Sequence, residues 1–228
     1  MRNIFKISFT LFLFLTFASF NNQPTNEISD SSEWISLFDG KTFDGWHSYN
    51  GDEISEKWSI ENGAMVFDPK NPNVKNLTSS GNIVTDQEFT NFELYLEWNV
   101  SEVGNSGLFW GVKEIDGLSQ PYLTGAEIQI LDNDRHPDAK NNPKFHQSGA
   151  LYDMVQPESD VCNPAGQWNI MILKINHAEN LGSVKLNGTK IVEFPLAGPK
   201  WAKLVENSKF KNWEYFGAYK TGKIGLQD

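Results

Sequence analysis

Residues 126–132 have the sequence Ala126-Glu127-Ile128-Gln129-Ile130-Leu131-Asp132. Successive side chains of a β-strand point to opposite faces of its sheet. Glu127 and Gln129 should therefore share one face, while Ile128 and Ile130 share the other. This alternation predicts a strand whose isoleucines enter a hydrophobic core and whose carboxylate and amide lie on the opposite face. Such a set of hydrogen-bonding groups could form a sugar site, although a sandwich strand with a polar outer face would have the same pattern.

Asp132 stands at an odd spacing from Glu127, so the two carboxylates would face opposite ways in a regular strand. A site common to both requires a β-bulge or the end of the strand. Residues 133–137 read Asn-Asp-Arg-His-Pro, which is typical of a loop and favours a strand end there. Two interpretations of Asp132 remain open: a site residue beside Glu127, or the cap of the following turn.

Short segments of alternating character, separated by turn residues, recur along the chain. Alternation is clearest in residues 92–100, and Asn-Gly pairs at 62–63 and 187–188 predict hairpins. One helix is expected over residues 201–210, a turn over 104–107, and a long loop over 132–147, a length that often carries function. The remaining expected strands are 34–38, 82–85, 108–112, 149–152, 168–175 and 222–228. The pattern predicts an all-β fold, an antiparallel β-sandwich.

The amino-terminal sequence predicts export. Arg2 and Lys6 precede a mostly apolar run over residues 7–17, and small residues follow at Ala18-Ser19. This order is typical of a secretory signal peptide, which we expect over residues 1–19. The apolar run is shorter than the about 20 residues of a membrane-spanning helix, so no transmembrane segment is expected. Residues 20–33 are polar and predict a flexible leader, and residues 34–228 a single β-sandwich domain.

Charge and cysteine content indicate which partners and which cellular compartment to expect. The formal net charge of the 228 residues is -10, which disfavours nucleic acid and anionic membranes as partners because both require a basic surface. Cys162 is the one cysteine, so the fold contains no intramolecular disulfide. No lipobox cysteine follows the apolar run. Together with the signal peptide, these features predict a periplasmic or extracellular protein.

Several short motifs, in their order along the chain, resemble the family of bacterial 3-keto-disaccharide hydrolase domains. The matching motifs are Ser36-Leu37-Phe38-Asp39-Gly40-Lys41, Gly45-Trp46, residues 58–63, Asn105-Ser106-Gly107, residues 127–132, Gly149-Ala150-Leu151-Tyr152, Trp168-Asn169, Leu186-Asn187-Gly188 and Gly225-Leu226-Gln227-Asp228. The resemblance implies a concanavalin A-like jelly-roll sandwich, as in lectins and glucanases. Members of this family usually continue beyond the last motif with one more strand, so the resemblance implies a domain that lacks its last strand in this sequence.

The resemblance implies a carbohydrate substrate whose C3 hydroxyl has been oxidised to a ketone, and hence a separate oxidoreductase acting first. The ketone acidifies the hydrogen on C2, so a base can remove it and the C1 group can leave before water adds. This chemistry needs a base, an acid and a group that stabilises the enolate. Glu127 and Asp132 could supply acid and base, and Gln129 could donate a hydrogen bond to an oxygen.

Other candidate residues lie in the loops. His136 and His146 could carry a proton at neutral pH, although each could equally be a solvated loop histidine. The motif match places Asn105 and Ser106 near the concave face, where the alternative is that they only shape a glycine-rich turn. Tyr152 could stack on a sugar ring or belong to the core.

No cofactor is expected, and the one alternative is a structural calcium ion. Asp132, Asp134 and Asp138 offer oxygen ligands for a structural calcium, but the glycine and distal glutamate of an EF-hand loop are absent. Two other functions remain open, because fold alone does not fix function. One is a non-catalytic, lectin-like carbohydrate-binding module, and the other is a structural or adhesive sandwich.

Overall fold

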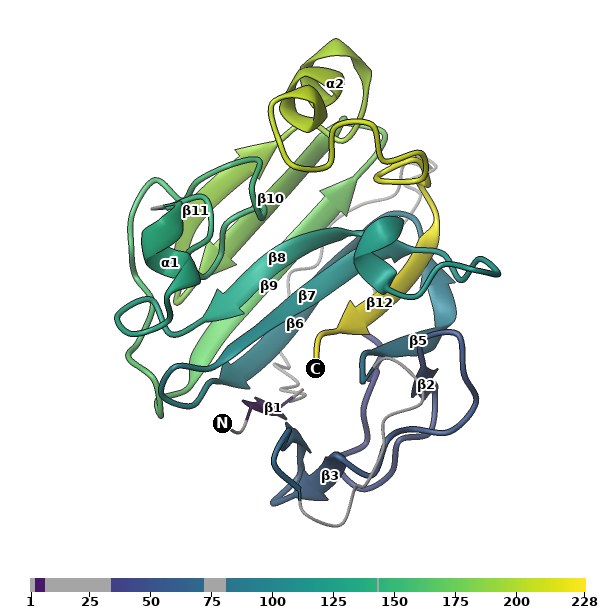
Figure 1. The fold of residues 1–228 in the computed structure, drawn as a ribbon, viewed down its shortest axis with the longest axis vertical. Helices are drawn as coiled ribbons and strands as arrows, with labels where there is room; N and C mark the ends of the chain where they lie inside the picture. The colour runs from purple at the N-terminus through teal and green to yellow at the C-terminus, as the bar shows by residue number, and fades with distance from the viewer. Residues whose placement is uncertain (1–2, 7–33, 72–80, 143) are drawn as a thin grey trace, which may run out of the picture.

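The computed structural model of the chain describes residues 3–6, 34–71, 81–142 and 144–228 (Figure 1). Its strands are β1 (Asn3–Lys6), β2 (Trp46–Ser48), β3 (Trp58–Glu61), β4 (Ala64–Phe67), β5 (Ile83–Phe89), β6 (Phe92–Asn99), β7 (Asn105–Val112), β8 (Ala126–Leu131), β9 (Asn169–Asn176), β10 (Leu181–Leu186), β11 (Thr189–Phe194) and β12 (Gly222–Leu226). The helices are the 3-10 turn η1 (Pro121–Leu123), α1 (Asp138–Asn141) and α2 (Gly198–Glu206).

Two antiparallel sheets form the sandwich. The seven-stranded sheet has the order β11-β10-β9-β6-β1-β4-β3, and the five-stranded sheet has the order β2-β5-β12-β7-β8. In Figure 1 the strands β7 and β8 overlap β6 and β9 of the other sheet. The predicted all-β, antiparallel sandwich is confirmed.

The main core fills the space between the sheets. Alternate residues of β6 point inward, and Leu96 and Trp98 are at most 1% exposed. Ile128 and Ile130 of β8 enter the same core, as the alternation of residues 126–132 predicts. A second cluster, on the other face of the five-stranded sheet, consists of Tyr49, Val84, Phe109 and Val112. Burial on both faces explains why every residue of β8 is buried.

Both Asn-Gly pairs form the hairpins that the sequence predicts. Asn62 and Gly63 have φ of 52° and 75°, and Asn187 and Gly188 have φ of 48° and 85°. Positive φ at both central residues matches the right-handed twist of the flanking strands. These turns join β3 to β4 and β10 to β11.

The outer edge of β8 is covered by irregular chain instead of a strand. The Gln129 amide donates to the Ala150 carbonyl at 3.0 Å, and Gly149 donates back to the Gln129 carbonyl at 2.8 Å. The Tyr152 amide donates to the Glu127 carbonyl at 3.0 Å. These bonds attach residues 149–152 directly to the backbone of β8. The expected strand over 149–152 is therefore wrong, since only Leu151 forms isolated bridges, to Ile128 and Val155.

Three other local expectations are corrected. Residues 34–38 form no strand, and Trp34 and Ile35 are 51% and 56% exposed because no neighbouring strand pairs with them. The expected turn at 104–107 belongs largely to β7, where Asn105 pairs with Leu131. The helix starts earlier than expected, at Gly198, because Pro199 suits its first turn.

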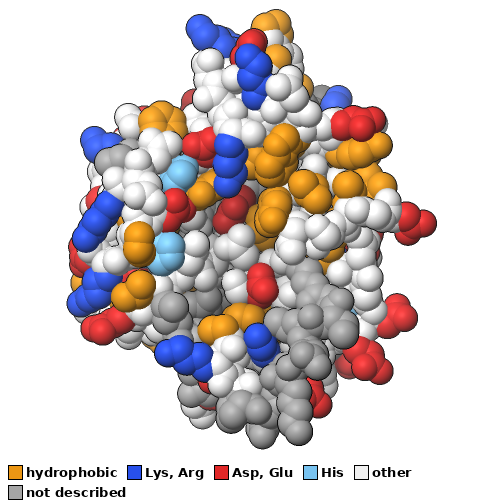
Figure 2. Space-filling model, viewed as in Figure 1, with side chains coloured by type: hydrophobic (Ala, Val, Ile, Leu, Met, Phe, Trp, Pro, Cys, Tyr) orange, Lys and Arg blue, Asp and Glu red, His pale blue; other side chains and the backbone are white. Residues whose placement is uncertain are grey.

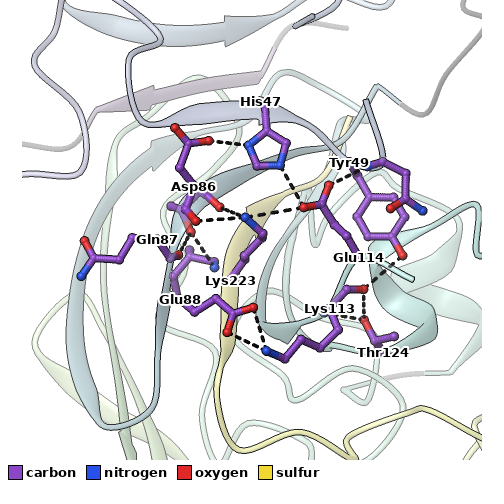
Figure 3. A network of polar contacts seen from close by, with 12 residues as sticks. His47, Tyr49, Asp86, Gln87, Glu88, Lys113, Glu114, Thr124 and Lys223 are labelled. Atoms are coloured by element: carbon purple, nitrogen blue, oxygen red, sulfur yellow. Dashed lines mark hydrogen bonds and ion pairs between the residues drawn. The ribbon is translucent and has the colours of Figure 1, made fainter. Parts of the chain in front are cut away.

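A polar network connects the strands at the β2 edge of the five-stranded sheet, opposite β8 (Figure 3). His47 of β2 contacts the Asp86 carboxylate of β5 at 2.5 Å through Nδ1, and the Glu114 carboxylate at 3.0 Å through Nε2. Lys223 of β12 lies 3.5 Å from the same Glu114 carboxylate. The network joins three strands and the segment after β7.

Most of the residues for which a signal peptide and a leader are predicted, at the amino-terminal end, are not described by the structure. Within the signal peptide range, Asn3–Lys6 forms β1 between β4 and β6. At the other end, β12 pairs with both β5 and β7. Within the described ranges, no helix combines the length and the apolar character needed to cross a bilayer.

Candidate active site

A cavity of about 190 Å³ opens on the outer face of the five-stranded sheet, around Glu127. Figure 2 shows this face hollowed near its centre, where acidic, basic, histidine and hydrophobic side chains meet. The described residues that line the cavity are Asn105, Tyr122, Glu127, Gln129, Tyr152, Lys209, Phe210 and Gln227. Strands β7 and β8 form its floor, and loops that follow β8, α2 and β12 form its walls.

Glu127 lies at the centre of this site and is only 7% exposed. Burial raises the pKa of its carboxyl to about 8, with the Lys209 ammonium opposing and the Asp138 carboxylate adding to the rise. A carboxyl with such a pKa exchanges its proton close to neutral pH. It is therefore suited to general acid and base chemistry.

Gly107 provides the space for the Glu127 side chain. It lies on β7 beside β8, and a Cβ atom added at Gly107 would lie 2.8 Å from Cγ and Cδ of Glu127. Real Cβ atoms do not approach other atoms so closely, so any larger residue would displace the carboxyl. The presence of glycine at the third position of the Asn105-Ser106-Gly107 motif is therefore explained by the space that the Glu127 side chain needs.

Gln129 presents a hydrogen-bond donor to the cavity. Its side-chain oxygen accepts a bond from the Ile130 amide at 3.0 Å, which fixes the orientation of the side-chain amide. No described residue accepts a bond from its Nε2 nitrogen, and the residue lines the cavity. The amide can therefore donate to a ligand oxygen.

Lys209 brings a positive charge to the cavity wall. Its Nζ lies 4.2 Å from the centroid of the Tyr152 ring and 5.3 Å from that of Phe210. Within the described part of the chain, no carboxylate forms an ion pair with this ammonium. The charge is thus available to a developing negative charge on a ligand.

Tyr152 contributes a hydroxyl that is held protonated. It donates to Asp138 Oδ2 at 2.9 Å, and burial together with this bond raises the pKa of the phenol above its usual value. The ring packs against His146, with centroids 4.3 Å apart. Tyr152 is therefore a wall of the site and not a base at neutral pH.

The other predicted site residues lie outside the cavity lining. Ser106 points into the sandwich and donates to the Gln227 carbonyl at 2.8 Å, so it joins β7 to the end of β12. His146 stands behind Tyr152, between Asp138 and Asp153. His136 accepts a bond from the Asp138 amide at 3.2 Å through Nδ1.

Asp132 caps the chain after β8 and does not share the cavity with Glu127. One carboxylate oxygen accepts from the Val103 amide at 2.9 Å, and the other from the Asp134 amide at 3.2 Å. Burial raises the pKa of Asp132, but these bonds and the neighbouring Arg135 guanidinium outweigh it, so the pKa lies below its usual value. These bonds are those of a cap, and neither Asp132 nor His136 lines the cavity around Glu127. Among the described residues, no set of three or more histidine, cysteine, aspartate or glutamate side chains is placed to hold a metal ion.

Comparison with known proteins identifies the relatives of this chain. The model of the 3-keto-alpha-glucoside-1,2-lyase-like domain family matches residues 33–228. The chain belongs to this family. It is 34% identical over 223 residues to the 3-keto-disaccharide hydrolase of Bacteroides thetaiotaomicron, covering 87% of this chain and 74% of the relative. The resemblance inferred from the ordered motifs is confirmed.

Solved structures share the fold of this chain. A glycosyl hydrolase candidate from Parabacteroides distasonis is 29% identical, with a TM-score of 0.76 and coverage of 85% of this chain and 86% of that one. A second one from the same organism is 23% identical with a TM-score of 0.55, covering 80% and 90% of the two chains, and shares the fold.

Four residues that line the cavity of this chain were not predicted from the sequence. They are Tyr122, Lys209, Phe210 and Gln227. Gln227 stands inside the matched motif at residues 225–228, so its position carried a signal. The other three come from η1 and from the segment after α2, where no local pattern marks a site. Their positions follow from tertiary packing, such as the stacking of Phe210 on Phe216 with ring centroids 3.9 Å apart.

We expect Asp132→Asn to keep the activity of the wild type and to lose stability. The asparagine keeps an acceptor for one amide but loses the negative charge that Arg135 and both amides stabilise, a loss of about 1 kcal/mol at pH 7. Because the pKa of Asp132 is lowered by folding, this contribution disappears as the pH falls through that pKa. Urea denaturation at pH 7 and at acidic pH measures the difference. A variant without activity but with wild-type stability would return Asp132 to the catalytic set.

Proposed function

We propose that this chain is a hydrolase that cleaves glycosides carrying a ketone at C3 of the sugar, by removal of the C2 proton, loss of the C1 group and addition of water. Membership of the family and the name of the Bacteroides relative support the substrate class. The observation that carries the reaction type is the single buried carboxyl, Glu127, in the described lining of the cavity.

One carboxyl fits elimination better than ordinary glycoside hydrolysis. Retaining and inverting glycosidases use two carboxyl groups on either side of the scissile bond, about 5–9.5 Å apart. The remaining described lining residues are amides, aromatic residues and a lysine. Elimination next to a ketone needs only one base if its conjugate acid then serves the leaving group.

The proposed sequence of proton transfers is balanced around Glu127. The ionised carboxylate takes the C2 proton, and the electron pair of the C2–H bond forms the enolate of the C3 ketone. The enolate then re-forms the ketone and expels the C1 oxygen, which takes a proton from the Glu127 carboxyl. Water adds to C1 of the resulting enone, C2 receives a proton, and the free 3-keto sugar is produced. A pKa of about 8 lets the same carboxyl accept and return a proton near neutral pH.

Lys209 and Gln129 are the proposed stabilisers of the enolate oxygen. The ammonium carries the charge that opposes the enolate, and the Gln129 amide offers a fixed donor. Aromatic side chains at Tyr122, Tyr152 and Phe210 offer surfaces for the sugar ring.

We expect Lys209→Met to lower kcat by about 10²-fold, as loss of one electrostatic stabiliser of a transition state does. Since the lysine also lowers the pKa of Glu127, the pH at which activity is half-maximal should rise. The control is Lys211→Met in the same segment, because Lys211 pairs with Glu206 on the surface. Steady-state kinetics across pH for both variants test this, and equal activities would remove Lys209 from the mechanism.

The test of the function is a comparison of two substrates. The purified chain is incubated with a 3-keto-glucoside and with its unoxidised parent, and release of the aglycone is followed. We expect release from the keto compound alone. If a folded protein cleaves neither compound but binds the sugar, the lectin-like alternative holds, and cleavage of the parent would reject elimination.

Two further proposals concern the setting of the reaction. The ketone substrate requires a sugar oxidoreductase that acts beforehand on the C3 hydroxyl. The sequence of residues 1–19 supports export to the periplasm or the cell exterior, and their removal would take β1 out of the seven-stranded sheet. Loss of these residues from the secreted protein, measured by mass spectrometry, would support that location.

A further inference from the structure

Behind the cavity, a histidine lies between two carboxylates that do not line it. His146 Nδ1 lies 2.8 Å from Asp138 Oδ1, and its Nε2 lies 3.0 Å from Asp153 Oδ1. The three side chains are only 24%, 12% and 14% exposed for Asp138, His146 and Asp153. Asn142 also donates to Asp153 Oδ1, at 3.1 Å. The proposed reaction uses none of these groups directly.

Each carboxylate also holds one wall of the cavity. Asp138 Oδ2 accepts the hydrogen bond of the Tyr152 hydroxyl at 2.9 Å, and Asp153 Oδ2 accepts that of the Lys209 amide at 2.6 Å. The His146 ring packs on Tyr152 at 4.3 Å between centroids, and Lys209 Nζ lies 4.2 Å from the same ring. The cluster thus connects the segment after α2 to the loop after β8 at the point where both line the cavity.

We propose that Asp138, His146 and Asp153 form a positioning cluster for the cleavage reaction, with His146 joining the two carboxylates that hold Tyr152 and Lys209 beside Glu127. This inference rests on the proposed function. Without the histidine, the two partly buried carboxylates each lose a hydrogen-bond contact and the ring that separates them. The Lys209 segment then loses its fixed distance from the reacting carboxyl.

The cluster also contributes to the field at Glu127. The charged groups that shift the pKa of Glu127 are the Lys209 ammonium and the Asp138 carboxylate. The Glu127 charge in turn raises the pKa values of Tyr122 and Tyr152. Asp138 raises the pKa of Glu127 and Lys209 lowers it. A change in Asp138 should therefore alter the pH dependence of the reaction and not only the stability of the fold.

The network in Figure 3 supplies a matched control. His47 also lies between two carboxylates, those of Asp86 and Glu114, but it is part of β2 and no member of that network lines the cavity. His47→Gln removes the same kind of contacts as His146→Gln. Any loss caused simply by breaking a histidine–carboxylate pair should appear in both variants.

The first experiment compares kcat, KM and the melting temperature of His146→Gln and His47→Gln on the 3-keto-glucoside. We expect His146→Gln to lower kcat by about 10²-fold with KM changed much less, as a small displacement of a catalytic group does. His47→Gln should keep the wild-type kcat. Equal kcat values in the two variants at equal melting temperatures would overturn the proposal.

The second experiment uses Asp138→Asn, which keeps the shape of the side chain, and needs no turnover. Titration of the Glu127 carboxyl by carbon-13 NMR should show its midpoint moving to lower pH than in the wild type, and the pH profile of kcat should move with it. An unchanged midpoint would overturn the proposal. If the wild type does not cleave the keto compound, the proposed function fails, whereas the NMR titration still tests the link between Asp138 and Glu127.

Discussion

Glu127→Gln should abolish cleavage of the keto substrate and at the same time stabilise the protein at neutral and alkaline pH. Glutamine cannot take the C2 proton, and removal of a general base costs about 10²–10⁴-fold in rate. The amide keeps the size of the side chain, so substrate binding should survive. Steady-state kinetics and calorimetric titration with the keto sugar measure the two effects.

The difference in stability between Glu127→Gln and the wild type should increase as the pH rises. Folding raises the pKa of Glu127 from 4.5 to about 8, so its contribution to stability is complete below about pH 4.5 and is lost as the pH rises to about 8. Glutamine does not titrate, so the variant does not lose stability in this way as the pH rises. At 1.36 kcal/mol for each pKa unit, the gain of the variant over the wild type at pH 8 is at most about 5 kcal/mol. Urea denaturation at pH 5 and pH 8 measures it, and a difference that does not grow with pH would mean that Glu127 is ionised in the folded protein.

Gly107→Ala should inactivate the protein nearly as completely as Glu127→Gln, although it changes no polar group. The new methyl group would overlap the Glu127 carboxyl and push it from its site. Overpacking of this kind costs about 1–3 kcal/mol, which a folded domain can tolerate. We expect a loss of activity of at least about 10²-fold with a modest fall in melting temperature.

The control for this steric argument is Gly51→Ala. A Cβ at Gly51 would meet Ser48 Cβ at 3.6 Å, an ordinary contact, and so the activity should be unchanged. Comparable activities for the two alanine variants would show that the carboxyl has room to move. The position of Glu127 would then not depend on Gly107.

The alternation in residues 126–132 was sufficient to predict the strand β8, its two faces and the polar pair Glu127 and Gln129. Asp132 was ambiguous because its position depended on where the strand ended, and it became a cap. Gly107 looked like a turn residue, since glycine is common in turns and its steric role required knowledge of the neighbouring strand. Lys209 could not be predicted because it reaches the cavity through the packing of a segment far away in sequence.

The covering of β8 by residues 149–152 has a consequence for how this site can change over evolution. Its hydrogen bonds join main-chain groups at Glu127, Gln129, Gly149, Ala150 and Tyr152. Gly149, with φ of 84°, requires glycine, whereas at the other four positions the bonds are made by the main chain whatever the side chain. Mutations can therefore replace the groups that face a sugar while the scaffold beneath them keeps its register. Variants of this architecture can therefore change the lining of the cavity one side chain at a time while β8 keeps its main-chain partners.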